Sequence, residues 1–437
     1  MSKKLSIIEV FAIILGAIIG WGSFMLPGTK FLSSAGVGNT FLGLLLGAMC
    51  IIIIERSYHI MMQETCEEGG EFSYIYKELG ANHGFIVGWF LSLAYLTMIP
   101  LNASAFPLVI NKLFEGLLDF GYLYTIAGDS VYFGEIIASY IVILIFMTIN
   151  LKGIKETGRV QKYIIFMLIM CILVVFFGMV MNVDSKNFIN NYVSNYKFNM
   201  KEILQVFAIT PFLYIGFDAI PQLATNFGFN NKKASILAVI SLLVGLLIYN
   251  LLNIATAMAY TPSQAIKFEW ALGSGVMQYI GKGGFLLLVI ALGAAVSSGI
   301  NGFMICSSKL IGAMGKQKVI SHKFNDRNKN GELSNSILFV SGISFIAVMF
   351  GREVILWIVD MSSLGAAIAY FYVCIATFKK QTIFGKKLIT LLGISSSILF
   401  ILLLLLPFSP AKLSIQSLVA LIIWTILGAI FWYRDRK

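Results

Sequence analysis

Long apolar stretches, separated by short polar segments, fill almost the whole chain. Twelve of them fit, with approximate limits of 6–31, 38–62, 84–111, 132–151, 159–182, 202–227, 234–260, 283–313, 335–351, 353–378, 386–407 and 413–433. Helices of about 17 to 25 apolar residues match the hydrocarbon thickness of a bilayer. The pattern therefore predicts an all-α integral membrane protein with twelve transmembrane helices.

The first apolar stretch contains residues that interrupt helices. Four glycines and Pro27 fall within Gly16–Gly28, and both residue types are unfavourable in a helix interior. The run from Gly20 to Ser23 lies near the middle of the span, where lipid offers no hydrogen bonds to freed backbone groups. A helix that opens there is expected to line a cavity or a substrate. The spacing of Gly16 and Gly20 also fits the alternative of close helix packing.

The sixth apolar stretch shows a second interruption. Pro211 and Pro221 bracket it, and Gly216 lies between them. A proline lacks an amide donor and disfavours a helical conformation in the residue before it. Asp218 falls near the membrane midplane, where an unpaired carboxylate costs at least about 2.5 kcal/mol. It is expected to act with Tyr214 as a protonation-linked gate, or to cap the second half of the broken helix.

Interruptions in the first and sixth spans indicate two inverted repeats of five helices. The expected organisation is a single transmembrane domain, 1–437, with a first repeat in 5–182 and a second in 202–380. Two further helices in 385–434 are expected at the periphery.

The polarity of the helix ends assigns a role to each break. The second half of span one begins at the midplane with the free amides of Gly22, Ser23 and Phe24, which suit a carboxylate. The first half of span six ends there with free carbonyls between Phe212 and Ile215, which suit an ammonium group. An α-amino acid presents both groups, so the pattern favours an amino acid as the substrate.

Aromatic side chains beside both breaks are expected to form the walls of this pocket. They are Trp21, Phe212, Tyr214 and Phe217. Because an aromatic wall also stacks on an organic cation, a polyamine or another organic amine is the alternative substrate.

The eighth stretch places two hydroxyls, Ser297 and Ser298, at membrane depth. With the carbonyls of Ala17 and Gly20 they form a candidate sodium site, although serines in such positions often bond back to their own helix. The expected coupling ion is therefore H⁺ or Na⁺, and neither a metal centre nor an organic cofactor is expected. Further polar residues inside apolar stretches are Tyr95, Asn102, Asn253, Asn301 and Asp360.

Charged residues are few and unevenly placed. They make up 12% of the 437 residues, and the mean hydropathy is +0.86, whereas about 25% is typical of soluble domains. With the N-terminus placed in the cytoplasm, more than two thirds of the 32 lysines and arginines fall on the cytoplasmic side of the spans. This bias predicts a multi-pass protein of the cytoplasmic membrane with both termini inside. It also accounts for the net charge of +11 without a nucleic-acid partner.

The sequence argues against an enzyme. The run from Gly69 to Phe72 spells a diguanylate cyclase motif, but the longest loops, about 20 residues near 183–200 and 315–334, are far too short for the soluble domain such an enzyme needs. Neither a His-Glu-x-x-His nor a Gly-x-Ser-x-Gly motif is present, and no pair of acidic residues is expected inside the membrane. A channel is a further alternative, but two broken helices at matching positions favour a carrier.

Four motifs together resemble the amino acid–polyamine–organocation superfamily of secondary transporters. They are Gly16–Phe24 followed by Pro27-Gly28, Glu68–Gly80 after span two, Asn150–Gly153 before span five, and Tyr214–Asp218 in span six. The resemblance covers essentially all twelve spans. It implies a LeuT-type five-plus-five fold and a permease that works by alternating access as a symporter or an antiporter.

The resemblance also implies a substrate site. It is made of the amides of Gly20, Trp21 and Gly22 for the carboxylate and the carbonyls of Ile18, Phe212 and Ile215 for the amino group. Phe212 would be an aromatic gate and Asp218 the residue linked to proton coupling.

The chain departs from the superfamily pattern in three places. Trp21 stands where a small residue is usual, and Cys66-Glu67 replaces a proline before the double glycine. In the fifth span no lysine lies deeper than Lys162.

Overall fold

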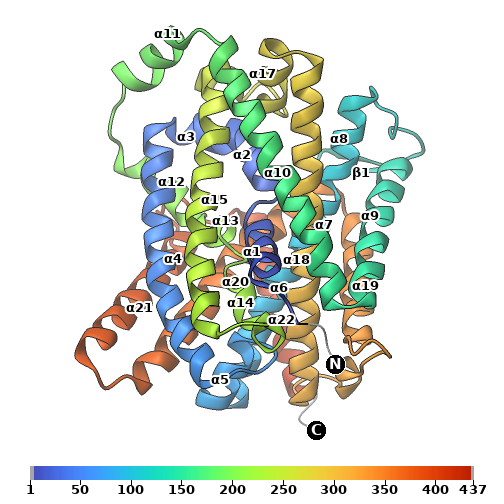
Figure 1. Cartoon of the computed structure of the whole chain (residues 1–437), viewed down its shortest axis with the longest axis vertical. Coiled ribbons are helices and arrows are strands. Elements are labelled where there is room, and N and C mark those ends of the chain that lie inside the picture. Colours follow the sequence, from blue (N-terminus) through green and yellow to red (C-terminus); the bar gives the residue numbers. More distant parts are fainter. Residues whose placement is uncertain (1–3, 435–437) are drawn as a thin grey trace.

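The computed structural model describes residues 4–434, apart from the side chains of residues 359 and 434, and it is almost entirely helical (Figure 1). Nine helices in this part of the chain are long and apolar enough to cross a bilayer. They are α4 (Gly38–Glu64), the run Ala81–Leu113 made of α6 (Ala81–Leu96), α7 (Met98–Ala103) and α8 (Ala105–Leu113), α9 (Phe133–Lys152), α10 (Ile154–Asn182), α15 (Asn231–Ala259), α18 (Lys282–Lys316), α20 (Gly351–Lys380), α21 (Phe384–Leu405) and α22 (Ile415–Arg434). The chain is a multi-pass membrane protein, as the apolar pattern predicts.

The first apolar stretch is broken, as its glycines predict. Helix α1 (Ile7–Ile18) begins at a capping box between Ser6 and Glu9. The second half runs from Trp21 to Ala35, through α2 (Trp21–Leu26), η1 (Pro27–Phe31) and α3 (Leu32–Ala35), and is bent by 46° from the first. Counted as one span, this pair would be the tenth in the described residues.

The break itself is shorter than the sequence suggests. It covers Ile19 and Gly20 only, so Trp21, Gly22 and Ser23 already belong to the second helical half. The helix restarts this early because the side chain of Asn102 accepts a hydrogen bond from the Trp21 amide, 3.1 Å away.

The sixth apolar stretch is interrupted as well. Its elements are α12 (Met200–Ala208), α13 (Thr210–Leu213), α14 (Ala219–Leu223) and η3 (Ala224–Asn226), with a non-helical turn over residues 214–218. The ninth predicted span corresponds to α19 (Ser334–Val348), which has only 15 residues. Both interruptions are thus observed, while the twelve-span, five-plus-five arrangement stays a prediction.

Short elements lie at the two ends of the bundle, named here the α5 end and the α17 end (Figure 1). The remaining helices are α5 (Glu71–Leu79), α11 (Ser185–Phe188), η2 (Ile189–Ser194), α16 (Pro262–Ala265), α17 (Ala271–Tyr279) and η4 (His322–Asn325). The expected cytoplasmic placement of the chain termini concerns residues 1–3 and 435–437, which lie outside the described residues.

A β-hairpin joins α8 to α9 and was not foreseen from the sequence. Strands β1 (Tyr122–Ile126) and β2 (Asp129–Tyr132) pair antiparallel. The two turn residues, Ala127 and Gly128, both have positive φ, 55° and 86°, as a tight hairpin turn requires. The Asp129 carboxylate accepts a hydrogen bond of 2.9 Å from the Arg352 amide and so ties the hairpin to the start of α20.

The two broken segments lie in the middle of the bundle. Helix α1 packs against α10, α15 and α18, α13 packs against α4 and α20, and α14 contacts both α1 and α18. Helices α10, α21 and α22 carry many exposed large apolar side chains, such as Phe166 and Ile422. This exposed apolar surface suits contact with lipid.

Candidate functional site

The two interrupted segments touch each other. Gly216, in the turn after α13, has a φ of +120°, and a Cβ at this position would lie 2.6 Å from the Cβ of Ala17 and 3.0 Å from the Ile18 amide nitrogen. Any other residue would clash and would also be strained at this φ. Gly216 therefore permits the close approach of the two breaks.

Tyr249, on α15, bridges the two breaks from the side. Its hydroxyl lies 3.2 Å from the carbonyl oxygen of Ile18 and 3.3 Å from that of Leu213. These carbonyls end the first halves of the two broken helices. The contact therefore ties the ends of the two half-helices together in a buried environment.

Backbone groups at the first break are only partly satisfied. The Trp21 amide donates to Asn102, and the Gly20 carbonyl accepts from both the amide (3.2 Å) and the hydroxyl (2.8 Å) of Ser23. Among the described residues, no hydrogen-bond acceptor is found for the Gly20 and Gly22 amides. A Cβ on Gly22 would lie 3.6 Å from the Phe212 ring, so these amides and the second break border the same space.

The turn at the second break places its side chains on different sides. Asp218 is fully buried, and its Oδ1 accepts a hydrogen bond of 2.7 Å from the Gly216 amide. It makes no side-chain cap to α14, so the capping alternative is wrong. The Tyr214 hydroxyl donates to the Leu44 carbonyl, and Phe217 packs against Tyr58, with ring centroids 5.3 Å apart. Both side chains thus contact α4.

A cavity of about 480 Å³ extends from the breaks toward the segment between α16 and α17. Trp21 and Phe212 line it together, so each broken segment supplies one wall. The guanidinium of Arg352 lies 4.9 Å from the centre of the Trp21 ring, a cation–π contact. The cavity is lined by the carboxylates of Asp129, Glu269, Glu353 and Asp360 and by the cations of Lys30 and Arg352.

The predicted sodium ligands make other contacts. The Gln161 side-chain amide, on α10, donates to the Ser298 hydroxyl and lies 3.2 Å from the Ala12 carbonyl and 3.4 Å from that of Ser298. The Gln161 side-chain oxygen accepts a hydrogen bond of 2.8 Å from the Asn301 side-chain amide. Ser297 is only half-buried. An uncharged amide nitrogen therefore lies among oxygens from α1 and α18.

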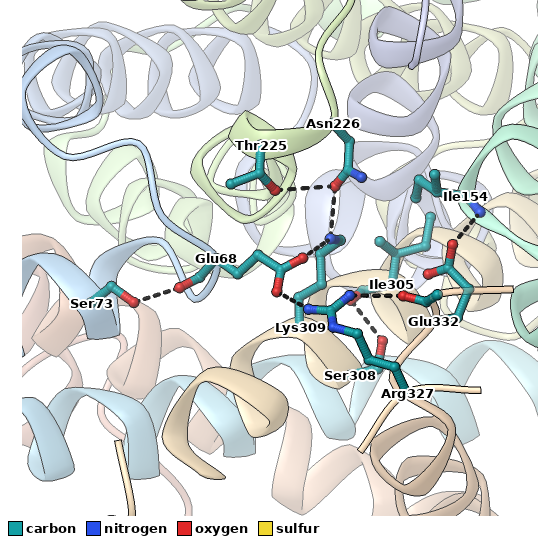
Figure 2. A network of polar contacts seen from close by, with 11 residues as sticks. Glu68, Ser73, Ile154, Thr225, Asn226, Ile305, Ser308, Lys309, Arg327 and Glu332 are labelled. Carbon is teal, nitrogen blue, oxygen red and sulfur yellow. Dashed lines mark hydrogen bonds and ion pairs between the residues drawn. The ribbon is translucent and has the colours of Figure 1, made fainter. Parts of the chain in front are cut away.

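An ion network lies at the α5 end (Figure 2). The ammonium of Lys309, on α18, lies 3.1 Å from Glu68 and 2.7 Å from the Asn226 side chain, and Arg327 pairs with the other oxygen of Glu68. Burial acts to raise the pKa of Glu68, but the charges of Lys309 and Arg327 outweigh it and hold that pKa below its usual range. The network joins the α4–α5 loop, the end of the sixth stretch, α18 and the α18–α19 loop.

Sequence reasoning missed the contacts of three polar side chains at this site. The sequence marks Asn102 only as a polar residue in an apolar stretch, and it does not distinguish Tyr249 or Gln161. The signal for Gln161 was a lone amide near the start of an apolar stretch. Tyr249 gave none, because a tyrosine within an apolar helix is ordinary.

A family described as "Amino acid permease" matches residues 5–432. A methylthioribose transporter of Bacillus subtilis is 25% identical over 284 residues, 61% of this chain and 59% of that protein. An aspartate-proton symporter of the same organism is 25% identical over 361 residues, 78% of this chain and 65% of that protein. An arginine/ornithine antiporter of Pseudomonas aeruginosa is 22% identical over 366 residues, 80% of this chain and 72% of that protein. The chain thus matches less than two thirds of the length of the first two relatives.

Proposed function

The chain belongs to the amino acid permease family, and we propose that it is a secondary transporter that moves an amino acid across the cytoplasmic membrane by alternating access. Family membership favours a transporter over an enzyme. The observation that carries the proposal is the meeting of two broken helices at the end of one cavity. Amides at the start of one half-helix and carbonyls at the ends of two others give this place backbone groups of opposite polarity, which suit the two charged groups of an α-amino acid.

The substrate carboxylate is assigned to the start of the helical segment Trp21–Ala35. The Gly20 and Gly22 amides are available for this carboxylate. Ser23 lies in the same turn, and its hydroxyl now donates to the Gly20 carbonyl. The Trp21 amide has only one hydrogen, so it must leave Asn102 before it can bind the substrate.

The substrate amino group is assigned to carbonyls of Ile18, Phe212 and Ile215. The Ile18 carbonyl already lies near the Tyr249 hydroxyl, but a carbonyl oxygen has a second lone pair for an ammonium donor. Trp21 and Phe212 serve as aromatic walls, and Phe212 serves as the gate on the cavity side.

The arrangement of the open and closed ends supports an outward-facing state. The cavity reaches toward the α17 end, while the network of Glu68, Lys309 and Arg327 closes the α5 end. We assign the α5 end to the cytoplasm, because the loops there carry most of the lysines and arginines.

An organic amine is the second candidate substrate. The cavity lining carries four carboxylates and two cations, and Lys112 pairs with one of the carboxylates, Glu269, at 2.8 Å. The remaining small excess of negative charge attracts cationic solutes. One relative is named as an arginine/ornithine antiporter, and such substrates carry an additional positive charge.

A proton is the coupling ion that the geometry favours, with Asp218 and Tyr214 at the gate; exchange without an ion is the alternative. Sodium at Ala17, Gly20, Ser297 and Ser298 would have to displace the Gln161 amide from Ser298 and compete with Ser23 for the Gly20 carbonyl.

Thermal stabilisation of the purified protein by a panel of amino acids and amines tests the proposal. A ligand that binds only the folded state raises the melting temperature, and the rise grows with the logarithm of the ligand concentration above its Kd. We expect stabilisation by one class of amino acid. Stabilisation by polyamines alone would replace the substrate assignment, and the absence of any effect across the panel would overturn it.

A further inference from the structure

Glu71 is a buried carboxylic acid that the transport site described above does not use. It is the first residue of α5 and has no exposed surface. It follows the turn at Gly69 and Gly70, both of which have positive φ. One carboxylate oxygen accepts 2.8 Å from the Gln222 side chain, and the other lies 3.4 Å from the Tyr95 hydroxyl.

Glu71 and Asp218 contact the same tyrosine, so the fold brings together two buried acids that the sequence does not predict as a pair. The Tyr95 hydroxyl that reaches Glu71 is also 3.4 Å from the Asp218 carbonyl oxygen. Both carboxyl groups are completely buried. The charge of Asp218, added to the larger effect of burial, raises the pKa of Glu71 well above its usual range.

Several polar atoms around the pair lack partners. In the described part of the chain, no hydrogen bond reaches Oδ2 of Asp218, Oε1 of Gln222 or the hydroxyls of Tyr58 and Tyr370. All four residues are at most 3% exposed. Unsatisfied acceptors in a buried site are costly, and a proton on one carboxyl group would convert an acceptor into a donor.

No cation compensates for the two acids. Among residues 4–434, no lysine or arginine forms an ion pair with either carboxyl group. The titratable groups that face the pair are Tyr58 on α4, Tyr74 on α5, Tyr95 on α6, Cys306 on α18 and Tyr370 on α20. All of these are neutral at physiological pH. Two buried like charges without a counter-ion cannot both ionise at low cost.

We propose that Glu71 and Asp218 form one proton-binding site, in which the two carboxyl groups share a single proton and Tyr95 and Gln222 position them. Its role as the coupling site rests on the proposed function, whereas proton binding can be measured without any substrate.

The site is linked to the closed α5 end. Glu71 is three residues from Glu68, and Gln222 is four residues from Asn226. The loop of Glu68 and Glu71 is therefore joined to the segment of Gln222 and Asn226 in two ways: directly, because the Gln222 side chain donates to both Glu71 and the Gly69 carbonyl, and through Lys309. Separation of these segments would open the α5 end and expose the shared proton to solvent.

The first test is the pH dependence of thermal stability of the purified full-length protein, between about pH 5 and about pH 9. The folded protein holds a proton that an unfolded glutamic acid releases above its ordinary pKa of 4.5. Stability should therefore fall as the pH rises. In E71Q the dependence of stability on pH should correspond to about one bound proton fewer than in the wild type. E67Q makes the same substitution at a more exposed residue of the preceding loop and should match the wild type.

The second test is infrared spectroscopy, which detects the carbonyl stretch of a protonated carboxylic acid near pH 7. The wild type should show this band, and E71Q should lose or shift it, as should D218N. A band and a pH profile that E71Q leaves unchanged would overturn the proposal. If the panel shows no substrate while the band persists and depends on Glu71, the transport proposal fails and the proton site stands.

Discussion

Loss of the Glu68 charge is expected to open the α5 end. The Lys309 side chain is only 6% exposed and Glu68 is 20% exposed, so their ion pair is largely removed from water. In E68Q the ammonium of Lys309 keeps Asn226 as a neutral partner, 2.7 Å away. Loss of a charge-assisted hydrogen bond in such a site costs about 2 kcal/mol. We add little for Arg327, because it is 41% exposed.

If this cost falls on the closed state alone, the equilibrium shifts toward the open state. About 2 kcal/mol corresponds to roughly a 30-fold change in an equilibrium constant. Cys306 lies three residues before Lys309 on α18 and has no exposed surface. Its labelling by a membrane-impermeant thiol reagent should therefore become about 10 to 30 times faster in E68Q than in the parent.

The labelling assay is best made in a C66S background, because Cys66 is exposed. E64Q is the matched control, since Glu64 is 42% exposed and its pair with Lys380 should contribute little. Because the pKa of Glu68 is lowered, its stabilising effect is present above pH 4.5 and is lost as the pH falls through that lowered pKa. A folded E68Q protein whose Cys306 stays as protected as in the parent would refute the role of this network.

The remaining predictions concern the two breaks and the coupling ion. G216A should abolish uptake and lower the melting temperature, because its Cβ would lie 2.6 Å from Ala17; G342A, where a Cβ meets nothing within 4 Å, should retain activity. N102L should raise KM at least several-fold with a smaller effect on stability, measured by uptake at varied substrate concentrations, because Asn102 fixes the start of the helical segment that carries the Gly20 and Gly22 amides. Replacement of sodium by choline should leave uptake unchanged, because the Ser298 hydroxyl already accepts a hydrogen bond from Gln161. Stimulation of uptake by sodium would instead support a sodium site at Ser297 and Ser298.

Much of the fold is readable from the sequence because lipid imposes a strong constraint on it. Apolar stretches of about the right length correspond to the observed helices, and Gly20 and Gly216 mark the two interruptions in the sequence itself. Backbone polarity also pointed to residues around both breaks. These features depend on local sequence.

The contacts that complete the site depend on tertiary packing. Gln161 reaches Ser298 across 137 positions, and Glu71 reaches Gln222 across 151. Glu71 stood inside a motif that resembled that of a soluble enzyme, and its burial beside Asp218 follows only from the position of α5. The hairpin was missed because its strands are short and lie in a loop between two apolar stretches.

The central claim is that the chain carries an amino acid between two aqueous compartments. The most direct test is counterflow in proteoliposomes that contain the purified protein and are preloaded with one unlabelled amino acid. We expect the same amino acid, added outside in labelled form, to accumulate transiently inside the proteoliposomes. This uptake should saturate with substrate concentration and should be absent in G216A. If no amino acid accumulates above protein-free liposomes while the wild type is folded, the account of the site is contradicted.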